Sequence, residues 1–166
     1  MKVYRYGAKV LREKAEPVKW SPEIRNFIME MFRTMKAESG VGLAAPQVGK
    51  SSRIIIIDVG EGPMAFINPE IIKKEGDSVA EEGCLSFPGI YFEIERAEKI
   101  EVKAVNDKGG EITVSAAGLA ARAIQHEVDH LNGVLIVDRA SFLNRKLAAG
   151  KLRRLKKEGQ KDEMLS

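Results

Sequence analysis

The stretch AAGLAARAIQHEVDHL (residues 116–131) predicts the helix around which the rest of the chain folds. It is rich in alanine, and Leu119, Ala123, His126 and His130 fall on one face at the spacing of an α-helix. His126 and His130 are the only histidines among 166 residues. The pair is either two exposed imidazoles on an ordinary solvated helix or the base of a metal site, and the remaining sequence has to decide between these interpretations.

The segments before this helix predict strands, and both ends of the chain predict further helices. Ser21 and Pro22 are typical of a helix start, and apolar residues recur at helical spacing through residues 22–38. A final helical stretch is expected at about 141–158, with Gly150 interrupting it. The expected strands are short and apolar or alternating: 53–59, 65–67, 70–74, 99–105 and 111–114, the last two forming a hairpin. We therefore expect an α+β fold, with a mainly antiparallel sheet around the central helix and with N-terminal and C-terminal helices.

The composition is that of one globular domain. Residues 1–144 are expected to form a single catalytic domain, and residues 145–166 a basic C-terminal helix that belongs to it. Cys84 is the only cysteine, so no internal disulfide can form, which fits a reducing, cytoplasmic compartment. The chain has no run of about 18 apolar residues, and its N-terminus lacks the apolar core of a signal peptide. We therefore expect no membrane insertion.

The basic residues are concentrated near the C-terminus. Residues 145–161 hold eight Lys or Arg and one Glu, so this segment carries +7 although the whole chain carries only +3. The remainder is therefore mildly acidic. Such a run is either a solvated helix face or a surface that binds an anionic partner.

The two histidines form an HExxH motif, HEVDH (126–130). Side chains four residues apart lie on one face of a helix, so His126 and His130 can bind one metal ion. Glu127 projects about 100° away and can reach a water beside the metal. A catalytic site normally needs a third protein ligand, and no histidine is left to supply it. Cys84, in EEGCLSFPG (81–89), is the candidate, although a lone cysteine is otherwise a small buried apolar residue.

Three segments together resemble the signature motifs of the peptide deformylase family: GVGLAAPQVG (40–49), EGCLSFPG (82–89) and QHEVDHLNG (125–133). They stand in the family's order and spacing, and the similarity extends from residue 6 to residue 139. The resemblance implies removal of the formyl group from the N-terminal formylmethionine of nascent polypeptides, with release of formate. It also implies one Fe²⁺ per chain, which Ni²⁺, Co²⁺ or Zn²⁺ can replace.

The residues fit this chemistry. Cys84, His126 and His130 would hold the metal, which lowers the pKa of water and so produces a nucleophile near neutral pH. Glu127 would take the proton from that water and deliver it to the leaving amine. The resemblance assigns the stabilisation of the oxyanion to the side-chain amide of Gln47 and the backbone N–H of Leu85. Gln47 has an ordinary alternative role, in which it caps a backbone group of its own loop.

The substrate-binding residues are expected on both sides of the metal. Gly42 and the glycines near it permit close approach of an extended peptide. Leu119, Arg122 (through its methylene stem) and Ala123 share the helix face of His126 and would line an apolar pocket for methionine, and the resemblance adds Val41 to this pocket. Core packing is the alternative for each of these residues. Tyr91 stands where some members of the family carry arginine, so the peptide preference beyond methionine is open.

Two other functions share parts of this pattern. A zincin-type endopeptidase uses the same helix but needs a third ligand other than Cys84, and a non-catalytic metal or redox sensor needs neither Glu127 nor Gln47. The expected partners are N-formylmethionyl nascent peptides. Some relatives dock on the ribosome through a C-terminal helix, so residues 145–161 are expected to dock on ribosomal RNA if they are more than a solvated face. No DNA partner is expected.

Overall fold

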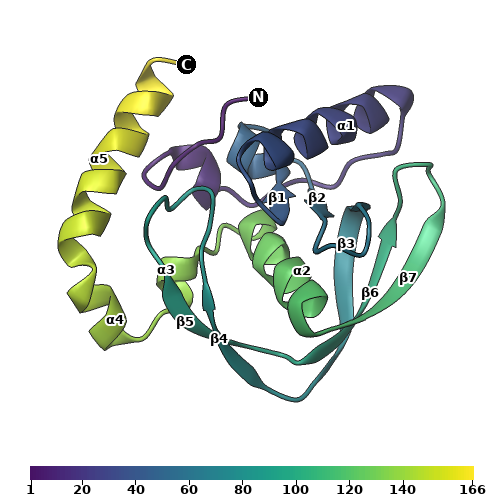
Figure 1. The fold of residues 1–166 in the computed structure, drawn as a ribbon. Coiled ribbons are helices and arrows are strands. Elements are labelled where there is room, and N and C mark those ends of the chain that lie inside the picture. The colour runs from purple at the N-terminus through teal and green to yellow at the C-terminus, as the bar shows by residue number, and fades with distance from the viewer.

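The computed structural model describes all residues, 1–166, and combines helices with antiparallel strands (Figure 1). The helices are α1 (Pro22–Ala37), α2 (Gly118–Leu131), α3 (Ile136–Arg139), α4 (Phe142–Leu147) and α5 (Ala149–Met164), with short 3-10 turns at η1 (Lys9–Arg12) and η2 (Ala45–Val48). The strands are β1 (Gly42–Ala44), β2 (Ile54–Ile57), β3 (Met64–Glu75), β4 (Ser78–Glu82), β5 (Phe92–Arg96), β6 (Lys99–Val105) and β7 (Glu111–Ala117). No helix is both long and apolar enough to cross a bilayer.

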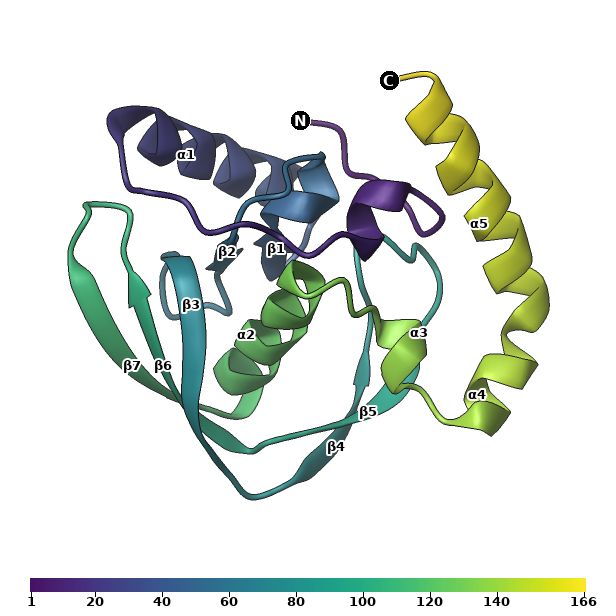
Figure 2. The same ribbon diagram turned by 180° about the vertical axis from the view of Figure 1, so that it is seen from behind.

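The strands form two antiparallel sheets. Five strands pair in the order β1-β2-β3-β6-β7, and β4 pairs with β5 in a separate two-stranded sheet. In Figures 1 and 2, α2 lies between these two sheets. Ten of its fourteen residues are buried, as expected for a helix that is covered on nearly all sides. The predicted α+β class, with a mainly antiparallel sheet around a central helix, is confirmed.

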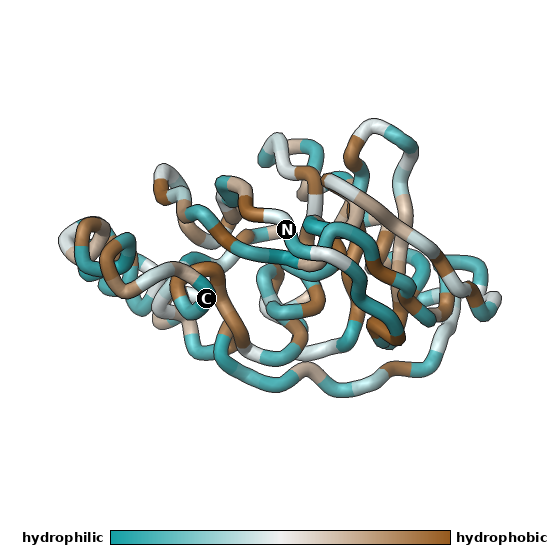
Figure 3. The backbone as a smooth tube through the Cα atoms, turned by 90° about the horizontal axis from the view of Figure 1, so that it is seen from below, coloured by the Kyte–Doolittle hydropathy of each residue, from teal (hydrophilic) through white to brown (hydrophobic).

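The run of four isoleucines in β2 explains why the larger sheet is covered on both faces. Side chains along a strand point alternately to opposite faces. Ile54 and Ile56 pack with α1 in one hydrophobic cluster, whereas Ile55 and Ile57 pack with α2 in another. All four are at most 1% exposed. The apolar run therefore fixes a layer order of α1, sheet and α2. Figure 3 shows hydrophilic and hydrophobic residues alternating along the outer strands and loops.

Two expected strands are in fact one. Residues 65–67 and 70–74 both belong to β3, whose pairing with β6 shifts register between Ile67 and Glu70. Asn68 lies at the shift with a φ of 52°, in the left-handed region that asparagine tolerates better than most residues. Its side chain bonds both the N–H and the carbonyl of Val18 (2.9 and 2.7 Å), so the irregularity ties the N-terminal segment to the sheet.

The C-terminal helix differs from the prediction in the position of its break, and it packs on the body of the protein. The interruption falls at Ala148, between α4 and α5, and Gly150 lies inside the first turn of α5. Leu152 and Leu155 are buried in a third hydrophobic cluster with β5 and α3. Gly159 is buried against the N-terminal segment, where a Cβ would lie 2.2 Å from the carbonyl oxygen of Tyr6. The helix is thus packed along the body (Figure 2), while the division at residue 144 stays a prediction.

Candidate metal centre

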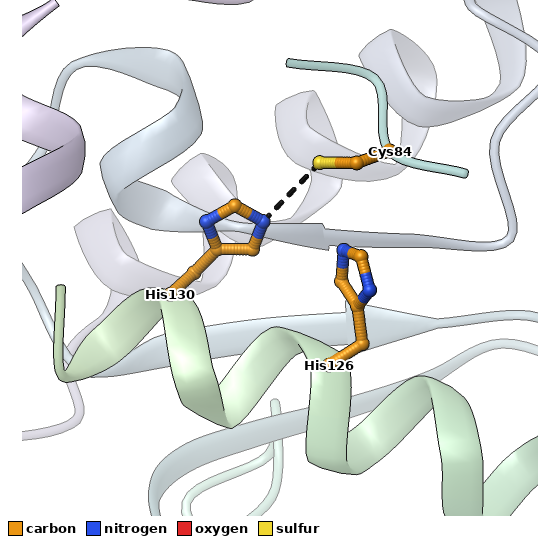
Figure 4. A group of neighbouring side chains, drawn as sticks. All are labelled: Cys84, His126 and His130. Carbon is orange, nitrogen blue, oxygen red and sulfur yellow. Dashed lines mark hydrogen bonds between the residues drawn. The ribbon is translucent and has the colours of Figure 1, made fainter. Parts of the chain in front are cut away.

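Helix α2 and the end of β4 bring one thiol and two imidazoles together (Figure 4). The possible ligand atoms of Cys84, His126 and His130 all lie within 4.8 Å of one another, and Cys84 Sγ is 3.4 Å from His130 Nε2. Bonds of about 2.0–2.3 Å in a tetrahedral site separate ligand atoms by roughly 3.3–3.8 Å. Only small movements would therefore be needed for these three side chains to hold one ion. A thiolate with two imidazoles is also a donor set that divalent transition metals accept.

A buried carboxylate orients His126. The Nδ1 atom of His126 lies 3.0 Å from Glu82 Oε2, which leaves Nε2 free to face the thiol. Glu82 also accepts two hydrogen bonds from Arg96 (2.8 and 2.9 Å) and one from Arg122 (3.0 Å). Burial alone would raise the pKa of Glu82, but the hydrogen bonds from Arg96 and His126 outweigh it and lower the pKa to about 2. The carboxylate is therefore ionised and accepts the imidazole proton, as the outer partner of a ligating histidine usually does.

The role of Glu82 was not predicted from the sequence. The residue stands two positions before Cys84 within a quoted motif, and this position was the only signal available. Its other partners come from distant segments, because Arg96 ends β5 and also bonds Asp129 of α2. Arg139 donates two further hydrogen bonds to the same aspartate (2.7 and 3.0 Å). The chain of contacts from Arg139 to His126 depends on tertiary structure alone.

Glu127 is buried without a hydrogen-bond partner. Its side chain is among the most buried charged groups, at 4% exposed, and its Oε2 has no partner in the protein. Burial raises the pKa of Glu127 to about 7, against the opposing effect of His126. A carboxyl group with such a pKa can both accept and release a proton near neutral pH. Glu127 also lies against β1, because a Cβ on Gly42 would be 2.5 Å from its Oε1.

This contact gives a prediction for Gly42→Ala. The added methyl would push the Glu127 carboxylate away from its position, and we expect activity to fall by about 10²-fold, the effect of a misplaced reacting group. Stability should change little, since the displaced atom is the end of a flexible side chain. Gly150→Ala is the matched control, because nothing lies within 4 Å of its Cβ position and its backbone φ is not positive. Steady-state rates and melting temperatures for both variants test this, and unchanged turnover in Gly42→Ala would show that the contact is unimportant.

Gln47 caps its loop and also points its amide toward the thiol. Its Oε1 accepts the N–H of Ala44 (2.9 Å), which is the ordinary role that the sequence left open. That bond fixes the side chain, and Nε2 then lies 3.6 Å from Cys84 Sγ and 3.2 Å from Ser86 Oγ. The N–H of Leu85 donates to no other backbone group of the protein. The Gln47 amide is thus directed toward the thiol, and the role of Ser86, which accepts a hydrogen bond from it, was not predicted from the sequence.

A cavity of about 610 Å³ opens beside these groups. Its lining includes Gln47, Cys84, Leu85, His126 and Glu127. It also includes all five expected substrate-binding residues, which are Val41, Gly42, Leu119, Arg122 and Ala123. Leu119 is 57% exposed, so core packing does not explain it, whereas Ala123 also belongs to the core cluster under α2. The guanidinium of Arg122 is occupied by Glu82 and by the carbonyls of Ile94 and Ser78.

Comparison with known proteins identifies the family. The polypeptide deformylase family model matches residues 1–146. The chain belongs to this family. Its sequence is 52% identical to the peptide deformylase of Thermotoga maritima over 149 residues, which cover 89% of this chain and 91% of that protein. It is 50% identical to the peptide deformylase of Desulfitobacterium hafniense over 141 residues, which cover 84% and 94%.

A solved deformylase structure also has this fold. The peptide deformylase from Thermus thermophilus superposes with a TM-score of 0.90 at 37% identity, covering 95% of this chain and 98% of that one. The family resemblance expected from the three motifs is therefore confirmed. Deformylases are metal-dependent, and the Cys84, His126 and His130 group is where such an ion could bind in this chain.

Proposed function

We propose that this chain removes the formyl group from the N-terminal formylmethionine of nascent peptides and releases formate, at a metal ion held by Cys84, His126 and His130. One observation carries the proposal. The thiol and both imidazoles converge beside the unpartnered Glu127 carboxylate, in a cavity of a chain that is about half identical to peptide deformylases. An endopeptidase would use another third ligand, and a sensor would have no use for a buried free carboxylate.

The metal, when bound, supplies a Lewis acid that makes water a nucleophile near neutral pH. Glu127 accepts a proton from the attacking water at its carboxylate and later donates it to the amine of methionine, so that the C–N bond breaks and formate leaves. The formyl oxygen gains negative charge during attack. Gln47 Nε2 and the Leu85 N–H stabilise that charge as fixed, uncharged donors. Glu82 keeps the ring of His126 in one tautomer and one orientation throughout.

We assign Fe²⁺ as the metal, one ion per chain, with Ni²⁺, Co²⁺ and Zn²⁺ as substitutes. The mixed thiolate and imidazole donor set accepts each of these ions, and the choice of iron rests on the family resemblance. Metal analysis of chain purified without oxygen tests it. Iron at one equivalent per chain supports the assignment, and zinc alone after such purification contradicts it.

The methionine side chain of the substrate would lie in the cavity near Val41, Leu119 and Ala123, with the methylene stem of Arg122 adding apolar surface. Gly42 would let the substrate backbone approach β1, the short edge strand of the larger sheet. An extended peptide can pair with such an edge through main-chain hydrogen bonds that tolerate many sequences. This suits an enzyme that processes many different N-termini.

Gln47→Ala should keep the metal and lose roughly 10²–10³-fold in turnover, the cost of removing one oxyanion donor. Gln47→Glu is the matched comparison, because it keeps the size and the oxygen that bonds Ala44 but has no amide donor. Turnover and metal content of both variants test the role. Near-normal turnover in Gln47→Ala would remove the side chain from the mechanism.

The release of formate tests the proposed function itself. The metal-loaded chain should produce formate from formyl-Met-Ala-Ser and leave acetyl-Met-Ala-Ser intact, since an acetyl carbonyl is bulkier and less electrophilic than a formyl carbonyl. Mass spectrometry of the peptide products should find Met-Ala-Ser unbroken. Cleavage inside the peptide, without formate, would favour the endopeptidase instead.

We further propose that the basic face of α5 docks on ribosomal RNA. Leu152, Leu155 and Gly159 face the body, and Arg153, Arg154 and Lys157 are exposed without ion pairs. An exposed cationic face whose basic side chains form no ion pairs attracts phosphates. Truncation after residue 144 would strip the core of Leu152 and Leu155, so neutralisation of surface charge is the cleaner test.

The triple variant Arg153→Gln, Arg154→Gln, Lys157→Gln should cosediment with ribosomes less than the unmodified chain at low salt. The control replaces Lys14, Lys19 and Arg25, which are also exposed and unpaired, with glutamine. Each phosphate contact lowers log K by about 0.7–0.9 for a tenfold rise in salt, so binding of the unmodified chain should weaken steeply from about 50 to 200 mM. Equal pelleting of both triple variants would leave α5 as a solvated face.

A further inference from the structure

Helix α4 carries an apolar surface that the chain itself does not cover. None of its six residues is buried. Phe142, Leu143 and Leu147 are 74%, 64% and 77% exposed, and we call these three residues the α4 patch. Leu143 and Leu147 lie four residues apart on one face of the helix, and Phe142 adjoins Leu143. Single exposed apolar residues are common, but a contiguous group of them marks an interaction site.

Positive charge borders the α4 patch on its own helix. Arg145 and Lys146 lie three and four residues after Phe142, so their side chains flank the apolar ones. Both are exposed, and neither forms an ion pair within the chain. An apolar centre with a charged rim is the anatomy of a protein–protein interface.

A surface of opposite charge lies next to the patch. On the outer face of the β4–β5 sheet, Glu81 is the register partner of Glu93, and the exposed Val79 is the partner of Glu95. None of the three glutamates forms an ion pair, and like charges directly opposite one another destabilise a sheet. Leu147 and Glu93 both line a hollow of about 450 Å³ between α4 and this face. Figures 1 and 2 show α4 beside the β4–β5 sheet at the edge of the molecule.

We propose that α4 and the outer face of the β4–β5 sheet form one self-complementary interface, through which two copies of this chain assemble into a symmetric dimer. In a two-fold contact, each pairing between the two copies occurs twice. The α4 patch of each copy packs on that of the other and fills the hollow beside Leu147. Arg145 and Lys146 of each copy then face Glu81 and Glu93 of the other.

The charges favour a second copy of the chain over other partners. An anionic bilayer or an RNA would be attracted by Arg145 and Lys146 but repelled by the glutamates alongside them. A second copy offers an apolar patch together with both charges, each placed where the other copy has its opposite. The basic residues of α5 that are proposed to contact RNA are not part of this interface. The inference is independent of the proposed function, because it concerns assembly and not the reaction.

Sedimentation velocity of the full chain over a range of concentrations tests the dimer. The unmodified chain should shift from one to two chain masses as its concentration rises, with a Kd below about 0.1 mM. Leu143→Ser combined with Leu147→Ser should raise the Kd by at least about 100-fold, because four leucines are lost from each dimer. Circular dichroism should show unchanged helix content, since both side chains are exposed in the single chain.

Two charge variants test the pairing itself. The first combines Arg145→Glu with Lys146→Glu, and the second combines Glu81→Lys with Glu93→Lys. Each variant alone brings like charges together across the interface, so its Kd should rise by about 10-fold or more. In an equal mixture every altered charge meets its opposite, and the two variants should associate with a Kd within about threefold of the unmodified value. Misfolded variants could not recover in this way.

Arg153→Glu combined with Lys157→Glu is the matched control, because it makes the same change of charge on α5, outside the interface, and should leave the Kd unchanged. A chain that stays monomeric at every concentration up to about 0.1 mM would overturn the inference. A dimer that the leucine variant leaves unchanged, or a mixture of charge variants that fails to recover, would overturn it as well. Binding of a monomer to anionic vesicles through Leu143 and Leu147 would assign the patch to a lipid surface instead.

Discussion

Glu127→Gln should retain one metal ion per chain and lose about 10²–10⁴-fold in turnover, the usual contribution of a general acid–base group. Glu127 is outside the proposed ligand set, and glutamine keeps its size in the narrow space beside Gly42. The amide cannot accept the proton of water, so attack and amine departure should both slow. Metal analysis and the rate of formate release, measured on the same preparation, test this expectation.

The same preparation supplies its own control. An unchanged metal content excludes collapse of the site as the cause of a lost rate, and Glu95→Gln controls for loss of a negative charge elsewhere. Turnover within about threefold of the unmodified chain would exclude Glu127 as the proton carrier.

Cys84→Ala, His126→Ala and His130→Ala should each lose the metal, and with it all measurable formate release. Each change leaves two protein ligands, and catalytic sites of this kind normally need three. Ser86→Ala is the matched control near the thiol, because Ser86 is buried beside Gln47 but is not a proposed ligand. Metal content by plasma emission decides the matter. A full equivalent of metal in any of the three alanine variants would remove that residue from the ligand set.

The fold could be predicted wherever the local pattern and the tertiary structure agree. The helical spacing around His126 predicts α2, and the apolar run predicts β2. Both predictions succeed because the apolar residues of these patterns are the ones that the fold buries. Strands β1, β4 and β5 were not predicted from the sequence. β1 is only three residues long, and the acidic β4–β5 pair has one polar face that includes opposed glutamates, which no propensity favours.

The candidate site divides in a similar way. His126, Glu127 and His130 could be chosen from spacing along one helix, and Cys84 from the need for a third ligand. Glu82 and Ser86 act through partners on other segments, and neither residue type carries a local sign of such a role. The close approach of Glu127 to Gly42 also depends on how α2 lies against β1, which spacing along the chain does not encode.

Titration of the metal-depleted chain with Fe²⁺ under anaerobic conditions, followed by formate release from formyl-Met-Ala-Ser, tests the central claim most directly. If Cys84, His126 and His130 hold the single ion that supports the reaction, activity should rise linearly and stop rising at one ion per chain. Formate release that needs no metal, or that keeps rising to two ions per chain, would contradict the account.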